Sequence, residues 1–388
     1  MKKKKYILTT VFLIGAVSAG CLIPAAHKEA DTSDWKEEPV IMIDQGLGMG
    51  FNKENGSLYP MDELAAERET GLFAKTAPEW KEEAEDSVMT IKGNGQEWNF
   101  PAEGYDEESG LIDYACGDYK EWEAGNYLVT VKLGDHEFER EICFRNMKNI
   151  RILAVPVTAY YSGEQVELSG LDDSMDDFTR KVYPLGKDDL EWGLYEGGTL
   201  TLRDESYDLD TPGGRYRIWR ILSGMQGEDY DLVVGFVPKN MLPHRNETDR
   251  SLTGFTFGEA ASVISLEDTS PEVTVAHEIG HCFGLGDEYE NGTFCLSNNM
   301  VPYGMEGRNA DRLSETVSGN CPYIRGGLGN EEQGTGTIIS KEQYAYDIMT
   351  DELIEHDMTS LMGLSGYSAK EYWSTADIWN TMYRALAE

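Results

Sequence analysis

The stretch Pro271–Tyr289, PEVTVAHEIGHCFGLGDEY, constrains this chain more than any other. It contains the pattern H-E-x-x-H-x-x-G-x-x-D, formed by His277, Glu278, His281, Gly284 and Asp287. In a helix, two histidines four residues apart lie on one face, where both imidazoles can bind one zinc ion. A glutamate next to the first histidine can take a proton from water at that metal. The stretch therefore predicts a helix that carries a catalytic metal site.

The flanking residues predict where this helix begins and ends. Ser270 is a good N-cap, and Pro271 suits the first helical position, where its missing N–H has no cost. Gly284 should end the helix, because glycine adopts the left-handed conformation easily. The chain can then turn back and bring Asp287 to the metal as third ligand, leaving a fourth position for water. Glu288 and His356 are alternative third ligands.

HEIGHCFGLGD resembles the extended zinc motif of the metzincin metalloproteases. Asp287 in the last position, followed by Glu288-Tyr289, resembles the IgA-peptidase (igalysin) branch of that family. Ser360-Leu361-Met362-Gly363 is similar to the family's methionine turn, and Trp373–Asp377 to the start of its C-terminal helix. Met349 and Met305 are alternatives to Met362.

The resemblance implies a zinc metalloendopeptidase with one catalytic Zn2+, held by His277, His281 and Asp287, and with Glu278 as general base. Met362 would pack beneath the metal without binding it. Gly254–Ser265 would be the edge strand that pairs with extended substrate, the alternative being a buried strand without substrate contact. Tyr289 and Tyr367 are candidates for stabilising the oxyanion.

The net charge narrows the choice of partner. Asp and Glu number 70 against 33 Lys and Arg, so the formal charge is −37 at pH 7. Nucleic acid is excluded as a partner, because phosphate binding needs a cationic face. We interpret the acidity as a soluble extracellular surface. Ca2+ sites and basic substrates are the alternatives. Asp208-x-Asp210-x-x-Gly213 is the nearest match to a Ca2+ loop, although a solvated loop fits that segment better.

Residues 1–20 read as a signal segment, and residues 21–38 as a flexible tether. The basic stretch Lys2–Lys5 precedes the apolar stretch Tyr6–Val17, as is typical of exported bacterial proteins. Cleavage after Ala19, lipid attachment at Cys21 and an uncleaved anchor are the three alternatives. We expect a monomer that is secreted or held at the cell surface and meets the membrane only through this segment.

The body of the chain is predicted to be α+β: an immunoglobulin-like β-sandwich over residues 39–148, then a metzincin-like α/β zinc-protease domain over 149–388. Tyr127–Leu133 and His136–Phe144 should form a hairpin around the turn Gly134-Asp135. The segment Ala124–Val131, AGNYLVTV, resembles the last strands of immunoglobulin-like sandwiches. In the second domain we expect strands at Ile150–Val157, Gly198–Arg203 and Tyr230–Pro238, and helices at Asp176–Tyr183, Lys187–Trp192, Tyr216–Met225 and from Ser374 to Leu386.

An exported chain permits disulfides, and five cysteines follow Cys21. Because five is odd, one thiol is unpaired, and Cys282 is the best choice since it should face the core. Cys295–Cys321 and Cys116–Cys143 are the expected pairs, with buried reduced cysteines as the alternative.

The function expected from the resemblance is hydrolysis of peptide bonds in extracellular host proteins or glycoproteins, with immunoglobulin A as one substrate. Two alternatives remain. One is a surface adhesion or glycan-binding protein with a relic zinc site, although an intact Glu278 has no use there. The other is a metzincin directed at mucin-type glycoproteins.

Overall fold

The protein is described by a computed structural model, in which residues Glu38–Glu388 form one compact unit. The structure describes residues 38–46, 64–107, 110–114, 122–166, 171, 175–238, 242, 253–266, 271–285, 287–288, 294–295, 344–347, 352–355, 359–362, 372–374 and 376–388. The expected signal segment 1–20 and nearly all of the tether 21–38 lie outside these residues. Among the described residues, no helix is long and apolar enough to cross a membrane.

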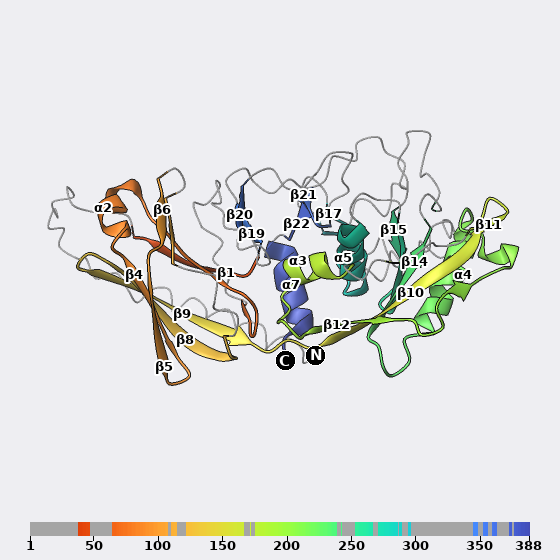
Figure 1. Cartoon of the computed structure of the whole chain (residues 1–388), viewed down its shortest axis with the longest axis horizontal. Helices are drawn as coiled ribbons and strands as arrows, with labels where there is room; N and C mark the ends of the chain where they lie inside the picture. Colours follow the sequence, from red (N-terminus) through yellow and green to blue (C-terminus); the bar gives the residue numbers. More distant parts are fainter. Residues whose placement is uncertain are drawn as a thin grey trace, which may run out of the picture. The chain divides into compact units, whose positions relative to one another are not determined.

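The chain is α+β, and most of its regular structure is sheet. Its first part contains two sheets, drawn in orange to yellow in Figure 1. The four-stranded sheet has the order β1 (Val40–Asp44), β3 (Gly71–Lys75), β7 (Leu111–Asp113), β6 (Gly104–Asp106). The five-stranded sheet has the order β2 (Leu64–Ala65), β9 (His136–Arg145), β8 (Gly125–Leu133), β4 (Val88–Gly93), β5 (Gln96–Pro101). Residues of both sheets share one hydrophobic core.

The hairpin predicted in this part is confirmed. Strands β8 and β9 pair antiparallel with Leu133 opposite His136, which leaves Gly134-Asp135 as a two-residue turn. Gly134 has φ +57°, as such a turn requires. On β9, Ile142 and Phe144 are buried, whereas Glu137, Glu139 and Glu141 are exposed on the opposite face.

Cys143 shares the outward face of β9 with those glutamates and carries a free thiol. The expected Cys116–Cys143 disulfide is therefore wrong, because the side chain alternation of the strand points this thiol away from the core. Cys116 and Cys321 lie outside the described residues, and so does the side chain of Cys295. Cys282 is buried and free, as predicted.

The second part is built on a seven-stranded sheet. Five of its strands follow in the order β11 (Glu164–Val166), β10 (Ile150–Tyr161), β14 (Leu232–Val237), β16 (Ala261–Ser265), β15 (Gly254–Thr256). The other two, β12 (Leu190–Leu194) and β13 (Leu200–Thr201), also pair with β10. Strands β10, β14 and β16 are parallel, whereas β15 at the edge is antiparallel to β16. Every residue of β14 is buried, as expected for a strand covered on both faces.

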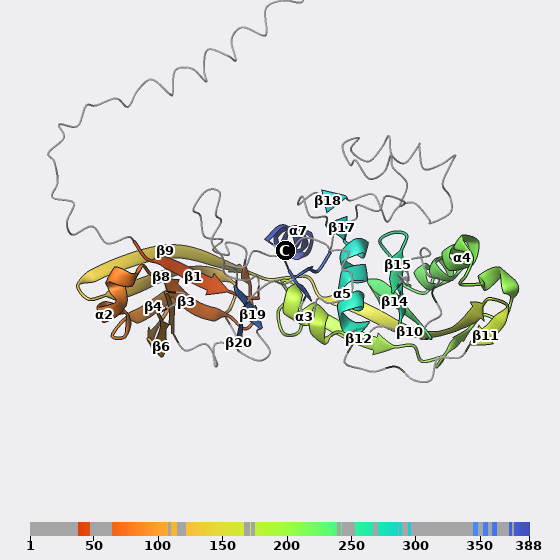
Figure 2. The ribbon, with the colours of Figure 1, turned by 90° about the horizontal axis from the view of Figure 1, so that it is seen from above.

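Helices cover both faces of this sheet (Figures 1 and 2). On β14, Val233 packs in the core that contains helix α4 (Pro212–Ser223), whereas Val234 packs in the core that contains α5 (Pro271–Cys282). The second core also holds residues of α3 (Asp177–Val182) and α7 (Ala376–Leu386). The alternation of apolar residues along the parallel strands thus builds one core on each face.

Two predictions for this part of the chain are wrong, and several others differ in their bounds. Lys187–Trp192 is not a helix, because Leu190–Leu194 pairs in parallel with the beginning of β10. Gly254–Ser265 is not one strand but two, β15 and β16, joined as an antiparallel hairpin. β10 extends four residues beyond the predicted end at Val157, and β13 covers only two residues of the predicted strand Gly198–Arg203. The helix predicted from Tyr216 begins earlier, at Pro212, because the Thr211 hydroxyl accepts the N–H of Gly214 and caps it.

The remaining elements are short. They are η2 (Pro78–Trp80), α2 (Lys81–Ala84), η3 (Glu205–Tyr207), β17 (Asp287–Glu288), β18 (Phe294–Cys295), β19 (Tyr344–Asp347), β20 (Glu352–Glu355), β21 (Thr359–Ser360) and β22 (Tyr372–Trp373). The pairs β17–β18, β19–β20 and β21–β22 are separate two-stranded ribbons.

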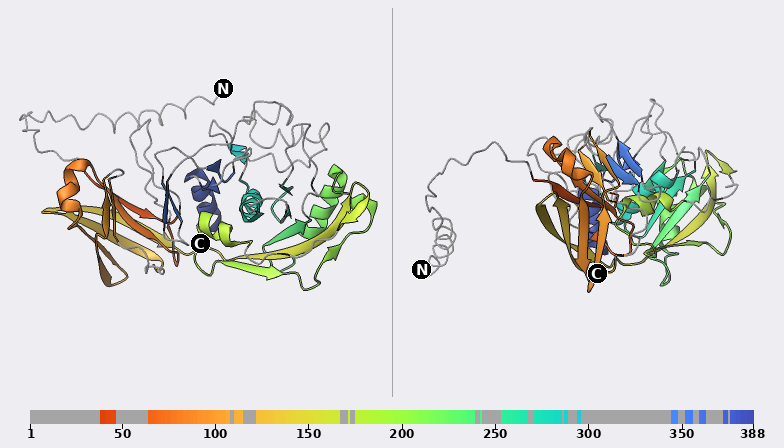
Figure 3. Two further views of the ribbon diagram at one scale, coloured as in Figure 1. Left: turned by 45° about the horizontal axis from the view of Figure 1, so that its top comes forward. Right: turned by 60° about the vertical axis from the view of Figure 1, so that its left-hand side comes forward.

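The C-terminal helix α7 belongs to two cores. Trp379 is fully buried in the core between the two N-terminal sheets, whereas Ile378 and Met382 lie in the core beneath α5. The left view of Figure 3 shows α7, in blue, next to α3, in light green. The division into 39–148 and 149–388 stays a prediction, but the last helix contributes side chains to the cores of both segments.

Arg68 ties the N-terminal sheets to α3. Its guanidinium is buried and donates to the carbonyl oxygens of Gln45 (2.9 Å), Arg180 (2.8 Å), Lys181 (2.9 Å) and Leu185 (2.8 Å). The carbonyls of Arg180 and Lys181 come from the last turn of α3, where a positive charge is favourable. The guanidinium carbon also lies 5.2 Å from the ring centroid of Trp379.

Candidate metal centre

The structure brings His277, Glu278 and His281 together on α5. One potential ligand atom from each of these side chains lies within 4.8 Å of the others. The two imidazole centroids are 4.6 Å apart with an interplanar angle of 85°. Among the described residues, this is the group of side chains that could hold a metal ion. The predicted spacing on one helical face is therefore confirmed.

Backbone carbonyls fix the tautomer of both histidines. The Nδ1 atom of His277 lies 2.8 Å from the carbonyl oxygen of Leu361, and that of His281 lies 2.8 Å from the carbonyl oxygen of Leu285. A carbonyl oxygen only accepts hydrogen bonds, so each Nδ1 must carry the proton and donate it. The lone pair of each ring is then on Nε2, which is the arrangement found in histidines that bind metals.

The turn after α5 supplies one of these carbonyls. Gly284 has φ +83°, and its N–H donates to the carbonyl oxygen of His281. The N–H of Leu285 donates to the carbonyl oxygen of Gly280, which completes a Schellman motif. The predicted helix stop at Gly284 is confirmed. This turn presents the carbonyl of Leu285 to the His281 ring. Ser270, the predicted N-cap, lies outside the described residues.

The second carbonyl comes from a distant segment. Leu361 follows β21, and its N–H donates to the carbonyl oxygen of Trp373 on β22 (2.7 Å). Met362 is fully buried, and its Sδ lies 3.0 Å from where a Cβ on Gly280 would be. Met362 therefore packs against α5, as expected of a packing methionine. Met305 and Met349 lie outside the described residues.

Glu278 is held by the edge strand β15. Its carboxylate oxygen Oε2 accepts a hydrogen bond of 2.6 Å from the hydroxyl of Thr256. Both side chains are almost fully buried, with 5% and 4% exposure. Gly254, two residues earlier on the strand, lies against the same carboxylate. Thr256 was not singled out by the sequence, because nothing local marks a threonine that meets a helix 22 residues later.

A buried tyrosine holds α5, and a cysteine of α5 itself is buried. The Tyr183 hydroxyl, just beyond α3, donates to the carbonyl oxygen of Ala276 (2.6 Å). Burial raises the pKa of Tyr183 well above its usual value, so this hydroxyl stays protonated. Burial, followed by the charge of nearby Glu278, likewise raises the pKa of the Cys282 thiol. Cys282 is thus an inert core residue.

The predicted third ligand is described only through its backbone. Asp287 lies three residues after Gly284, as the first residue of β17, and its backbone pairs with that of Cys295. The side chains of Asp287 and of the alternative ligand Glu288 lie outside the described part of the structure. His356, Tyr289 and Tyr367 lie outside it as well.

The segment suggested for Ca2+ forms a turn. The Oδ1 atom of Asp208 accepts the N–H of Asp210 at 3.0 Å, and Thr211 caps α4. Asp208 and Asp210 belong to no group of potential metal ligands among the residues described. The Ca2+ site and the solvated loop both stay predictions for Asp208–Gly213.

Comparison with known proteins adds no relative to this picture. No protein-family model matches the sequence, and a search of curated proteins also finds no match.

Proposed function

We propose that the chain is a zinc metalloendopeptidase of metzincin type. One observation carries the proposal: two histidines with Nδ1 bound to backbone carbonyls flank a buried carboxylate on the same helix. A purely structural zinc site needs no carboxylate beside its ligands, whereas peptide hydrolysis needs a base there. Two imidazole nitrogens are a donor set that suits zinc.

The zinc ion would be held by the Nε2 atoms of His277 and His281 and by Asp287. The Schellman turn at Gly284 supports the third ligand, because it reverses the chain just before Asp287 enters β17. When bound, zinc supplies Lewis acidity toward water and the scissile carbonyl. Glu278 would accept the proton of the attacking water and return it to the leaving amine.

Further features support the metzincin resemblance. β15 is the antiparallel edge strand of a mostly parallel sheet, and it passes directly beside Glu278. Met362 packs below α5, next to the residue that binds His277. The two sheets of the N-terminal part enclose a common core, which supports an immunoglobulin-like sandwich as the accessory domain.

Protein substrates outside the cell follow from the signal-like segment and from the acidic composition. Immunoglobulin A is proposed as a substrate on the family resemblance alone. The alternative functions predict different outcomes in one experiment. An adhesion or glycan-binding protein with a relic site would bind zinc and cleave nothing. A mucin-directed metzincin would cleave a mucin-type glycoprotein and spare immunoglobulin A.

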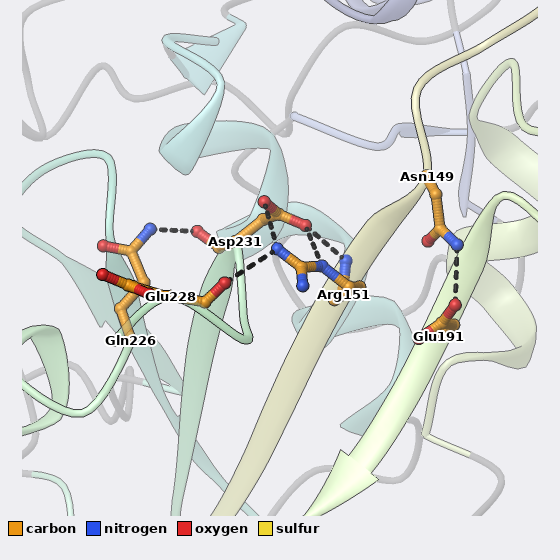
Figure 4. A network of polar contacts seen from close by, with 6 residues as sticks. All are labelled: Asn149, Arg151, Glu191, Gln226, Glu228 and Asp231. Atoms are coloured by element: carbon orange, nitrogen blue, oxygen red, sulfur yellow. Dashed lines mark hydrogen bonds and ion pairs between the residues drawn. The ribbon is translucent and has the colours of Figure 1, made fainter.

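The test uses purified protein with zinc, offered native immunoglobulin A, a mucin-type glycoprotein and an unfolded general substrate. Glu278→Ala should reduce cleavage by about 1,000-fold or more, because it removes the general base and its charge. Zinc content, measured by atomic emission, should remain at one ion per chain. Glu191→Ala is the matched control, since Glu191 is an exposed glutamate on β12 that hydrogen-bonds only Asn149 in Figure 4. Cleavage by Glu278→Ala within tenfold of the unsubstituted protein would refute the mechanism.

A further inference from the structure

The carboxylate of Glu278 has two chemically different oxygens in this fold. Oε2 accepts the short hydrogen bond from the Thr256 hydroxyl. The same hydroxyl lies 3.4 Å from the carbonyl oxygen of Glu278, so its single proton belongs to the nearer and more basic carboxylate. One lone-pair region of Oε2 is thereby occupied, whereas Oε1 receives no donor from Thr256.

Oε1 lies beside the backbone of Gly254. A Cβ at this glycine would be 2.7 Å from Oε1 and 2.8 Å from the Glu278 Cγ, closer than real Cβ atoms come. The missing side chain therefore provides the space that the glutamate occupies. Because strand residues alternate between faces, Gly254 and Thr256 point to the same face of β15. One short strand thus contacts both oxygens of one carboxylate.

We propose that Thr256 is a positioning residue for Glu278. Its hydroxyl holds Oε2 so that Oε1 is the oxygen that exchanges the proton, and Gly254 makes the room for this rotamer. This inference rests on the proposed peptidase function, since it assigns the orientation of that general base. It also places the residue that orients the general base and the edge available to extended substrate on one strand, because β15 ends the sheet in the described part of the chain.

The physical reason for such a device is the freedom of glutamate. A glutamate side chain has three rotatable bonds, and ordering it has an entropic penalty. A general base must lie within hydrogen-bonding reach of the proton that it abstracts. A misplacement of about 1 Å can reduce a rate by about 100-fold. A hydrogen bond from a strand in the sheet fixes the carboxylate before substrate arrives.

The first experiment replaces the hydroxyl without changing the shape of the side chain. Thr256→Val should reduce kcat by about 100-fold, while KM changes by less than about twofold, because substrate contacts stay and only the base is misplaced. Thr256→Ser keeps the hydroxyl and should recover most of the loss. Ser262→Ala is the control: Ser262 lies opposite Thr256 on β16, and its hydroxyl has no hydrogen-bond partner among the described residues.

The second experiment needs neither zinc nor activity. Unfolding by urea is measured on metal-free protein for Thr256→Val, Glu278→Ala and the double variant. A hydrogen bond to a buried carboxylate should couple the two substitutions by about tenfold or more in the unfolding equilibrium constant. Should Thr256→Val not fold, Thr256→Ala removes the same hydroxyl. Additive effects in this cycle would overturn the proposal, and so would an unchanged kcat.

The two experiments separate this inference from the proposed function. A wild-type protein that hydrolyses no substrate, combined with clear coupling in the cycle, would refute the catalytic role while the hydrogen bond itself stands. A wild-type peptidase whose Thr256→Val variant keeps full kcat would refute the positioning role while the proposed function stands.

Discussion

Replacing Arg68 with methionine should destabilise the protein strongly. Arg68 is buried, and four hydrogen bonds run from its guanidinium to carbonyl oxygens. Methionine has a similar length and can still pack against Trp379, so the packing loss is small. The substitution therefore isolates the polar contribution of this junction.

The magnitude follows from two opposing effects. Hydrogen bonds from a charged donor contribute about 1.5–3 kcal/mol each, so four contribute about 6–12 kcal/mol. Burial lowers the pKa of Arg68 to about 9, which Asp44 partly opposes. A fall from 12.5 to about 9 corresponds to about 5 kcal/mol against the charged form. The difference, about 1–7 kcal/mol, brackets the 3–5 kcal/mol typical of breaking a buried charge pair, and we expect a loss of about 3–5 kcal/mol.

Urea unfolding followed by circular dichroism measures this loss. Arg151→Met is the matched control, because the Arg151 side chain pairs with Asp231 at the surface, as Figure 4 shows, and both side chains are more than a third exposed. That exposed pair should contribute little to stability, because solvent and salt screen it. A loss for Arg68→Met that is no larger than the loss for the control would refute the reasoning.

Three further predictions concern α5. Gly280→Ala should destabilise the protein by about 1–3 kcal/mol in urea unfolding, although alanine favours helices. The new Cβ would lie 2.5 Å from the Tyr183 hydroxyl and 3.0 Å from the Met362 Sδ, which is too close. A more stable variant would contradict this prediction. Tyr183→Phe should reduce stability by about 1 kcal/mol at neutral pH. Because burial raises the folded pKa of Tyr183, wild-type stability should fall as the pH rises above about 10, and Tyr183→Phe should lack that part of the fall in a pH series of unfolding midpoints. Zinc at about 1,000 times its Kd should raise the free energy of unfolding of the wild-type protein by about 4 kcal/mol, as measured by thermal unfolding. His277→Ala should show no such gain. His136→Ala, a control on the exposed hairpin, should keep it.

Local signals in the sequence predicted the elements that lie at the site. The bounds of α5 follow from Pro271 and Gly284, and the spacing of His277 and His281 already implies one helical face. The β8–β9 hairpin and β14 were equally readable, since a two-residue Gly-Asp turn and a continuous apolar run are short-range patterns. These features depend on residues close together in the chain.

The errors and omissions involve partners far apart in the chain. Lys187–Trp192 has no strand-like alternation, and only pairing with β10 makes part of it a strand. The contact of His277 with Leu361 spans 84 residues and uses a backbone carbonyl, which any residue could supply. Thr256 and Arg68 likewise owe their roles to surroundings that only the fold assembles. Sequence therefore indicated the candidate residues of the site but not the atoms that hold them.

The placement of Trp379 has a consequence for synthesis. The core between the N-terminal sheets contains residues up to Phe144, so Trp379 emerges 379 − 144 = 235 residues after the rest of that core. At about 5–20 residues per second, the nascent chain spends roughly 12–47 s with a tryptophan-sized gap there. The Leu361 carbonyl that orients His277 also arrives late. A chain that ends before Leu361 therefore lacks both the tryptophan of that core and the carbonyl that orients His277.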